Sequence, residues 1–407
     1  MRLFKDTTPH TVLAGFLTVV IGWAGPNVLI YSVQTAAGLD NATAMSWLWA
    51  GAILTGIAGI YLSLRTRQPM LVTWSTPGIA FLVTALPGFR FSEAIGAFLV
   101  SALIVTALGF VRPLTRMVER LPVGLAGALN AAILMPFAFH ALTAATQLPV
   151  VVGAMIASYF IARQLNAQWA VAVVLVVGLA ASAATGSLHP VSVPIELTIP
   201  QFVMPEFTWR AMVSLAIPLS LLAFTGQFLP GTGVLRANGY EPDLGRGLRA
   251  CGLVSIPAAL VGCHNLTMAA LLANVVSGPE ADPDKSKRYT AAVWASVMFI
   301  VVGLFAGTML HLMGILPPAA LAALAGLALL SALGQSFHTA FTTAVKGSLA
   351  APVVIAVALS GFAPFGIGSA FWGIVGGIAV LGIEKYVRLP VRSPAPEPAL
   401  VPEPTDA

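Results

Sequence analysis

Long apolar runs follow one another along almost the whole chain. A hydrophobic run of about 17–25 residues is long enough to cross a lipid bilayer as a helix. Of the 407 residues, 58% are hydrophobic and 9% are charged, whereas a soluble domain carries about 25% charged residues. A soluble fold of this size has no core that could bury so much apolar surface. We therefore predict an integral membrane protein of the lipid bilayer, and the net charge of +5 does not indicate nucleic-acid binding.

We predict an all-α polytopic fold with fourteen membrane spans. They are residues 11–37, 44–64, 70–86, 92–111, 122–141, 149–164, 169–185, 210–235, 249–261, 263–276, 290–313, 317–335, 348–362 and 366–386. Spans 9, 10 and 13 are short, so that a count of twelve is the alternative. The first run is too long for a signal peptide and is predicted to be retained. The Pro-rich, acidic tail after residue 390 is predicted to be disordered.

The placement of Lys and Arg supports this topology. With a cytoplasmic N-terminus, the even-numbered loops and both termini lie in the cytoplasm, and they hold 18 of the 20 basic residues; Arg90 and Arg210 are the exceptions. Cytoplasmic loops of membrane proteins carry such an excess. Because one missed span would reverse the sides of all later loops, the asymmetry favours fourteen spans with both termini in the cytoplasm.

Two pairs of segments indicate an internal repeat. Leu121-Pro122 opens span 5 in the same way that Leu316-Pro317 opens span 12, and Gly22–Pro26 in span 1 resembles Gly226–Pro230 in span 8. Both pairs are seven spans apart, so the second copy would enter the membrane from the opposite side. This is the inverted-repeat arrangement of secondary transporters, although chance similarity between small-residue helices is the alternative.

Spans 3 and 10 carry signals of helices that are broken within the membrane. In span 3, the β-favouring segment 70–74 precedes Ser75-Thr76-Pro77-Gly78, in which a hydroxyl residue before Pro predicts a helix start. In span 10, Gly262 is a predicted break and Asn265 a predicted helix cap. Two helix N-termini that meet in the membrane would attract an anion such as a carboxylate. An ordinary Pro kink is the alternative for span 3.

Polar groups and aromatic rings at these breaks, and in spans 1 and 8, are the candidates for substrate binding. An amide in the middle of a span needs a partner, so Gln227 either binds substrate or joins span 8 to a neighbour, and Trp23 either lines the site or packs against lipid or a helix. The predicted substrate-binding residues are Trp23, Asn27, Ser75, Thr76, Gly78, Thr225, Gln227, Phe228, Cys263, His264 and Asn265.

Ionisable groups within the spans are few. No Asp or Glu lies in the middle of a span, which leaves His264, at the predicted break of span 10, as the candidate for proton coupling. Imidazole titrates near neutral pH, but a buried His often only bonds a backbone carbonyl. No P-loop, HExxH motif or metal-ligand spacing occurs. We therefore predict neither an enzyme nor a metal or cofactor site.

Several segments together resemble the bacterial benzoate transporter (BenE) family of benzoate/proton symporters. They are Trp74–Gly78, Gln227–Gly231 with Ala237–Tyr240, Gly278–Asp284 before Arg288, and Gly366–Gly373. The resemblance implies import of benzoate or a related aromatic carboxylate with protons by alternating access, in the bacterial inner membrane. The alternatives are a carrier of another small anion or a nucleobase, and a passive anion channel.

The resemblance also implies the seven-plus-seven fold of nucleobase permeases, with a substrate site between the half-helices of spans 3 and 10. A core domain would comprise residues 1–112 and 210–314, and a gate domain residues 113–186 and 315–390, with an extracytoplasmic connection at 187–209 and the tail at 391–407. Nucleobase relatives hold a carboxylate in spans 8 and 10, where this chain has Gln227 and His264–Asn265. A homodimer is expected by analogy of fold.

Overall fold

The computed structural model describes residues 2–24, 26–111, 113, 123–167, 169–342 and 348–386, with the backbone alone for residues 2, 24, 26 and 27. The predicted tail 391–407 and the opening of span 5 at Leu121-Pro122 lie outside the described residues. The α-helices are α1 (Arg2–Asp6), α2 (Pro9–Ala24), α3 (Pro26–Ala37), α4 (Asn41–Thr66), α5 (Thr76–Ala85), α6 (Phe91–Phe110), α8 (Val123–Gln147), α9 (Pro149–Leu165), α10 (Ala170–Ala184), α11 (Trp209–Ala211), α12 (Ile217–Ala223), α13 (Leu229–Ala237), α14 (Leu244–Leu260), α15 (Ala273–Ser277), α16 (Tyr289–Leu304), α17 (Ala306–Met313), α18 (Pro318–Thr342), α19 (Ala350–Leu359) and α20 (Ser369–Tyr386).

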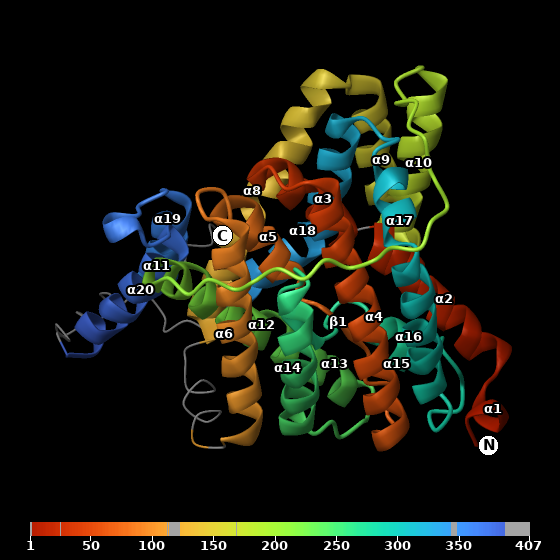
Figure 1. Ribbon diagram of the computed structural model, residues 1–407, viewed down its shortest axis with the longest axis horizontal. Coiled ribbons are helices and arrows are strands. Elements are labelled where there is room, and N and C mark those ends of the chain that lie inside the picture. Colours follow the sequence, from red (N-terminus) through yellow and green to blue (C-terminus); the bar gives the residue numbers. More distant parts are fainter. Residues whose placement is uncertain are drawn as a thin grey trace, which may run out of the picture.

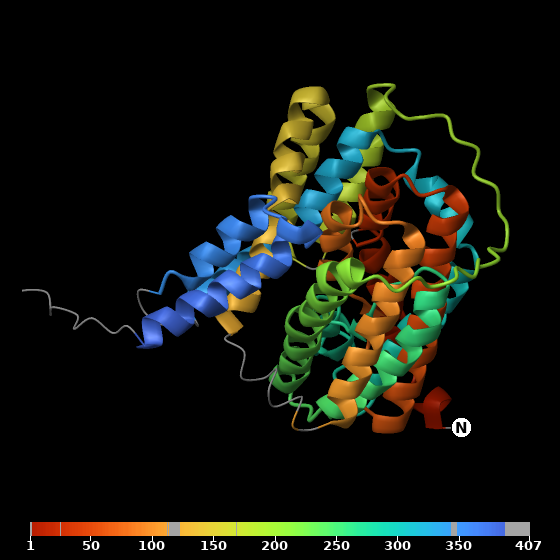
Figure 2. The ribbon, with the colours of Figure 1, turned by 60° about the vertical axis from the view of Figure 1, so that its left-hand side comes forward.

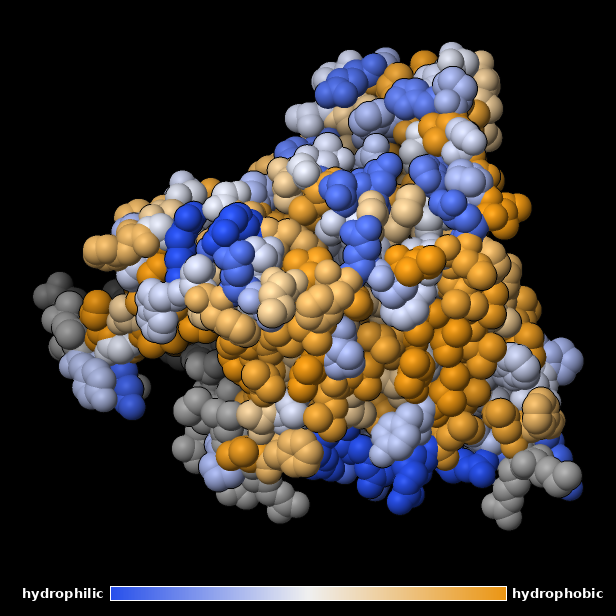
Figure 3. All heavy atoms as spheres, viewed as in Figure 1, coloured by the Kyte–Doolittle hydropathy of each residue, from blue (hydrophilic) through white to orange (hydrophobic). Residues whose placement is uncertain are grey.

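The predicted all-α membrane fold is confirmed in its coarse form. Among the described residues, six helical segments are long and apolar enough to cross a membrane, and a seventh is reached if α16 and α17, bent by 80° at their junction, count as one span. The six are α2 with α3, α4, α6, α8, the segment Trp209–Ala237 and α18. Hydrophobic side chains cover the middle of the face in Figure 3, and hydrophilic ones gather along its lower edge. The count of fourteen stays a prediction.

Pairs of helices from distant parts of the chain pack along one another. α4 packs against α16 and α6 against α14, and α2 lies on the other side of α16. α8 packs along α18, and α19 and α20 form a pair beside α8 that projects at the left of Figure 1. Figure 2 shows that this pair also projects away from the upright bundle that contains α4, α6 and α14.

Span 3 is broken as its sequence predicts. After α4, strand β1 (Val72–Trp74) runs through the interior, and α5 starts at Thr76. Ser75 is the N-cap of α5, because its Oγ accepts a hydrogen bond from the N–H of Gly78 at 3.2 Å. Pro77 has no N–H that would stay unpaired in this first turn. The local capping signal therefore suffices to start a helix inside the bundle.

Span 10 is also broken, but its details differ from the prediction. Gly262 has a φ of +99°, which ends α14 in a conformation that L side chains rarely adopt. Strand β2 (Leu266–Met268) follows and pairs antiparallel with β1, Thr267 opposite Thr73. The predicted helix cap at Asn265 is wrong, because Asn265 extends this pairing: its carbonyl accepts the N–H of Ser75 at 3.0 Å. The next helix, α15, begins only at Ala273.

Span 8 is one long helical segment with two π-helical stretches. These are η1 (Met212–Ala216) and η2 (Phe224–Phe228), and the second contains Gln227. A π-helical turn inserts an extra residue and is frequent at functional sites, because it turns side chains out of the regular helical register. In span 1, α2 ends at Ala24 and α3 starts at Pro26. The boundary between the two helices therefore coincides with the Gly25-Pro26 pair of the sequence.

The Pro-rich connection at 186–207 is without helix or strand. It runs in the open across the helix ends in Figure 1 and is tied to them by backbone hydrogen bonds. Thr198 donates to Leu304 at 2.8 Å, Val203 to Leu260 at 2.9 Å and Glu206 to Ser92 at 2.9 Å.

Candidate functional site

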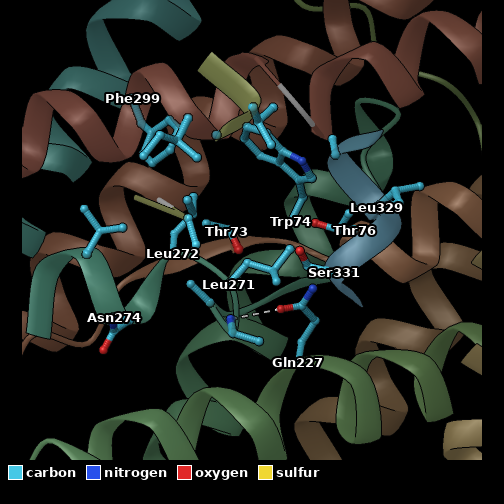
Figure 4. Close-up of a pocket in the computed structure, with 18 residues that line it drawn as sticks. Thr73, Trp74, Thr76, Gln227, Leu271, Leu272, Asn274, Phe299, Leu329 and Ser331 are labelled. Atoms are coloured by element: carbon cyan, nitrogen blue, oxygen red, sulfur yellow. Dashed lines mark hydrogen bonds between the residues drawn. The ribbon is translucent and has the colours of Figure 1, made fainter. Parts of the chain in front are cut away.

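A central cavity of about 280 Å³ lies beside the two-stranded sheet. Its walls come from α2, β1, α5, α10, η2, the turn after β2, α15, α16 and α18, so that both broken spans contribute (Figure 4). A second cavity of about 580 Å³ adjoins it and extends to Ala237 and Thr339, near the ends of α13 and α18. The residues that line both cavities are Thr76, Gln227, Ala270, Leu271, Leu329 and Ser331.

The amide of Gln227 is held in one orientation. Its Oε1 accepts a hydrogen bond from the backbone N–H of Ala270 at 3.1 Å, drawn as the dashed line in Figure 4. Since the oxygen is used in this way, the Nε2 amide hydrogens remain for the cavity. This contact links η2 to the turn after β2. Of the two alternatives for Gln227, a link between span 8 and a neighbouring segment is therefore confirmed. Binding of substrate by Gln227 stays a prediction.

Two hydroxyl groups lie beside this amide. Thr76, the first residue of α5, and Ser331 in the middle of α18 both line the cavity, and Figure 4 shows their oxygens on the same side as the Gln227 nitrogen. Thr76 also lies at the N-terminus of a ten-residue helix, where the aligned peptide dipoles leave partial positive charge. The polar end of the cavity is thus rich in donors and suits an anion.

The remaining wall is apolar and aromatic. Trp74 on β1 and Phe299 on α16 meet edge to face, with ring centroids 5.8 Å apart, and Leu272 lines the same side. Trp23 also packs edge to face on Trp74, with ring centroids 6.3 Å apart. Trp23 is 8% exposed and does not line the cavity. Trp23 therefore packs against a ring of the aromatic wall, as one of its two predicted alternatives had it.

The predicted residues of span 10 lie behind the cavity. The Nε2 atom of His264 lies 2.9 Å from the carbonyl oxygen of Ser75, and its ring is flanked by Trp47 and Phe98 at centroid distances of 5.6 and 6.2 Å. Because a carbonyl only accepts, Nε2 carries the hydrogen. Cys263 and His264 are fully buried, and neither lines the central cavity. Asn265 is also buried, and its side-chain amide has no partner among the described residues.

Gly78 and Gly226 permit close approaches around the site. A Cβ on Gly78 would lie 2.9 Å from Cδ2 of His264, and one on Gly226 would lie 3.0 Å from the amide nitrogen of Asn130. Thr225 lines the second cavity, while its hydroxyl donates to the carbonyl of Leu221 at 2.7 Å.

Two other predicted residues do not add to the described walls. Phe228 is fully buried in η2 and does not line the central cavity. Asn27 lies in α3, and its side chain is outside the described part of the chain.

Several lining residues are marked by no motif or break in the sequence that predicts a binding role. The sequence predicts an extended conformation for Thr73 and Trp74, and Trp74 also opens a segment of the family resemblance, but no sequence feature selects Phe299, Asn274 or Ser331. Phe299 and Ser331 come from α16 and α18, whose apolar sequences contain no break. Their position in the cavity wall follows from the rotation of these helices about their axes in the bundle.

Within the described ranges, no group of three His, Cys, Asp or Glu side chains could hold a metal ion.

A third cavity, of about 350 Å³, lies between α5, α8 and the α19–α20 turn. Two hydrogen bonds lie in the wall of this cavity: Arg210 Nε donates to the carbonyl of Gly366 at 3.0 Å, and the N–H of Gly368 donates to Ser214 Oγ at 3.1 Å. We call these four residues the clasp. The guanidinium of Arg210 also lies over the ring of Phe89, at 4.5 Å from its centroid. The clasp joins span 8 to the projecting α19–α20 pair.

Comparison with known proteins identifies relatives over nearly the whole chain. A "Benzoate membrane transport protein" of Acinetobacter baylyi is 33% identical over 372 residues, which is 91% of this chain and 94% of that protein. The "Inner membrane protein YdcO" of Escherichia coli is 33% identical over 377 residues, covering 93% of this chain and 96% of that protein.

Similar solved structures indicate the fold alone, because their sequence identity is low. SLC26A9 superimposes with a TM-score of 0.61 at 14% identity, over 91% of this chain and 65% of that one. The transmembrane domain of a cyanobacterial bicarbonate transporter, BicA, gives 0.58 at 15% identity, over 91% of this chain and 97% of that one. These are anion-transporter structures, and the nucleobase-permease inverted repeat stays a prediction.

The family model "BenE: Benzoate membrane transport protein" matches residues 5–383. The match leaves out only the first four residues and the end of the chain. The chain therefore belongs to the benzoate membrane transport protein family.

Proposed function

We propose that this chain imports benzoate or a related aromatic carboxylate together with protons, by alternating access, across the bacterial inner membrane. The observation that carries the proposal is the division of the central cavity into two ends. Thr76, Gln227 and Ser331 form a donor-rich end, and Trp74 with Phe299 forms an aromatic end. A ring that bears one carboxylate has the same division.

The chemistry of the two ends supports this substrate class. A carboxylate accepts hydrogen bonds at both oxygens, and the Gln227 amide together with two hydroxyls supplies donors for them. Aromatic rings prefer offset or edge-to-face contacts, which contribute about 0.5–1.5 kcal/mol beyond their burial. The cavity volume of about 280 Å³ lies just below the range for pockets that bind drug-sized ligands, roughly 300–1,000 Å³, which fits a small substrate.

Alternating access is supported by the asymmetry between the two sides of the site. The second cavity leads from Gln227 to the last residue of α13, while the third cavity, on the α19–α20 side, shares no described lining residue with the central or the second cavity. We assign Arg236, beside the end of this cavity, to the cytoplasm by the placement of basic residues. The described arrangement then corresponds to a carrier that opens to the cytoplasm.

The helix pairs support the two proposed domains and their inverted repeat. If spans 2 and 4 are equivalent to spans 9 and 11, the packing of α4 on α16 repeats as the packing of α14 on α6. Both pairs belong to the proposed core, and α8 with α18 belongs to the proposed gate. The substrate would lie between them and change sides as the core moves.

Proton coupling is supported by energetics. Entry of an anion against an interior-negative potential costs about 2.3 kcal/mol per 100 mV, and one co-transported proton cancels this charge. His264 is the proposed carrier of the proton, since its Nδ1 atom is buried without a partner among the described residues. Benzoic acid that binds in its protonated form is the alternative.

A second candidate is a carrier of a small inorganic anion. The observation that favours it is the fold shared with the transmembrane domain of a bicarbonate transporter. The large aromatic wall of the central cavity favours the aromatic substrate instead.

Uptake into proteoliposomes tests the proposal. We expect purified protein to accumulate labelled benzoate when the outside is acidic, with excess unlabelled benzoate competing and bicarbonate not competing. Absence of uptake would contradict the benzoate assignment. Uptake that does not respond to an imposed pH gradient would contradict the symport of protons.

A further inference from the structure

We propose that Arg163 supplies the positive charge for the substrate carboxylate, and that it acts through the hydroxyl of Ser331. Arg163 lies in the last turn of α9, outside the cavity wall, and neither the broken spans nor span 8 contains it. This inference deepens the proposed function and rests on it, because it concerns the same central cavity and the same class of substrate.

The walls of the site carry no charge of their own. None of the residues that line the central cavity or the second cavity, within the described part of the chain, is Asp, Glu, Lys, Arg or His. A carboxylate would therefore enter a neutral, largely apolar space. Such a burial is costly unless a cation or several donors compensate the charge.

Ser331 connects this space to a cation. Arg163 Nη1 donates to Ser331 Oγ at 2.7 Å and to the Tyr159 hydroxyl at 3.1 Å, and the two hydroxyl oxygens are themselves 3.1 Å apart. Ser331 lines both cavities, while Tyr159 is 2% exposed. The guanidinium thus lies one hydroxyl group away from the cavity.

The count of hydrogens determines what Ser331 offers to a ligand. The hydroxyl oxygens of Tyr159 and Ser331 both accept hydrogen bonds from the guanidinium, because a guanidinium has donors only. The hydrogen bond between these two oxygens uses the hydrogen of one hydroxyl group and leaves the other free. If Tyr159 donates to Ser331, the Ser331 hydrogen is free to face the cavity. A hydroxyl that accepts from a cation becomes a stronger donor, since linked hydrogen bonds polarise one another.

The turn that follows Arg163 also belongs to the site. Ala167 and Val171, which flank the start of α10, line the central cavity. The start of α10 therefore forms part of the cavity wall, and the preceding helix α9 carries the cation. Arg163 is a positioning residue in this arrangement: Ser331 touches the substrate, and Arg163 orients and polarises it.

Benzoate binding to the full-length protein, in wild-type and Ser331→Ala backgrounds, tests the inference. Arg163→Gln is expected to weaken benzoate binding about fivefold to tenfold in the wild-type background, the scale of the net contribution of one hydrogen bond. In the Ser331→Ala background the same change is expected to have little further effect, because the connection is already lost. The matched control is Arg65→Gln, which removes another exposed arginine in the last turn of α4. This variant should bind benzoate as the wild type does.

The outcomes separate this inference from the proposed function. Wild-type protein that binds no benzoate would contradict the proposed function itself. If the wild type binds, then unchanged affinity in Arg163→Gln, or equal losses in both backgrounds, would overturn the role of Arg163 alone. Arg163→Lys keeps the charge and is expected to bind within about threefold of wild type. A loss with lysine as large as that with glutamine would also overturn the role of the charge.

Discussion

The Gln227 side chain accepts a hydrogen bond from the backbone N–H of Ala270 at 3.1 Å, and this contact determines which half of its amide faces the central cavity. The oxygen is held against the turn after β2, and the nitrogen remains beside Thr76 and Ser331. A π-helical turn and a broken span thereby orient one donor toward the place assigned to a carboxylate.

Replacement of Gln227 by Glu is the sharpest test of this donor. The change preserves the size of the side chain but places a second carboxylate beside the substrate, and like charges brought together cost several kcal/mol. We expect benzoate uptake to fall by more than about tenfold, with Gln227→Ala affected less. Gln201→Glu, on the exposed connection, introduces the same charge away from the cavity. Equal uptake by Gln227→Glu and Gln201→Glu would contradict the assignment.

Trp74 should govern the preference for an aromatic substrate. Trp74→Ala removes one of the two rings of the aromatic wall, and we expect the affinity for benzoate to fall by about tenfold, from the lost contact with the ring. Affinity for small inorganic anions should not fall. Competition binding measures both, and Trp209→Ala, with a tryptophan that is 78% exposed, is the control. Retained benzoate affinity in Trp74→Ala would remove this ring from the site.

The break in span 3 was predictable, and the outer parts of the site were not. Ser75, Thr76 and Pro77 form a capping signal that acts within four residues, so the start of α5 follows from local chemistry. Asn265 shows the limit of this reasoning. Its amide suits a helix cap, but pairing of the distant strands β1 and β2 takes its carbonyl instead.

Ser331 and Arg163 show a second limit. They are 168 residues apart and meet only because α9 packs against α18. Neither segment has a local break, a cap or a motif at these positions. The sequence pattern assigns Arg163 only to the cytoplasmic side, as one of many basic residues there. The geometry of the bundle, which the sequence pattern does not contain, places it beside the cavity.

Gly78 should be essential for the stability of the site. A Cβ at this position would lie 2.9 Å from Cδ2 of His264 and 3.0 Å from Oγ of Ser75. Overpacking of this kind costs about 1–3 kcal/mol, so we expect Gly78→Ala to melt several degrees lower than wild type in detergent. Gly153→Ala has no heavy atom within 4 Å of the added carbon, and it should melt at or above the wild-type temperature. Equal melting temperatures for the two variants would contradict the packing described around Gly78.

The clasp should control access to the third cavity. Arg210→Ala removes the bond to Gly366, and we expect a cysteine placed at Thr84 in that cavity to react several-fold faster with a membrane-impermeant maleimide. Arg90→Ala is the control, because Arg90 pairs with Glu206 and not with the α19–α20 turn. Labelling at an unchanged rate in Arg210→Ala would show that the clasp does not restrict this side.

A structure of the protein with 4-bromobenzoate bound tests the central claim most directly, because bromine marks the orientation of the ring. We predict that the carboxylate lies about 2.7–3.2 Å from Nε2 of Gln227, the range of ordinary hydrogen bonds, and that the bromine end lies against Trp74 and Phe299. A ligand outside the central cavity, or one whose carboxylate faces the aromatic wall, would contradict the account.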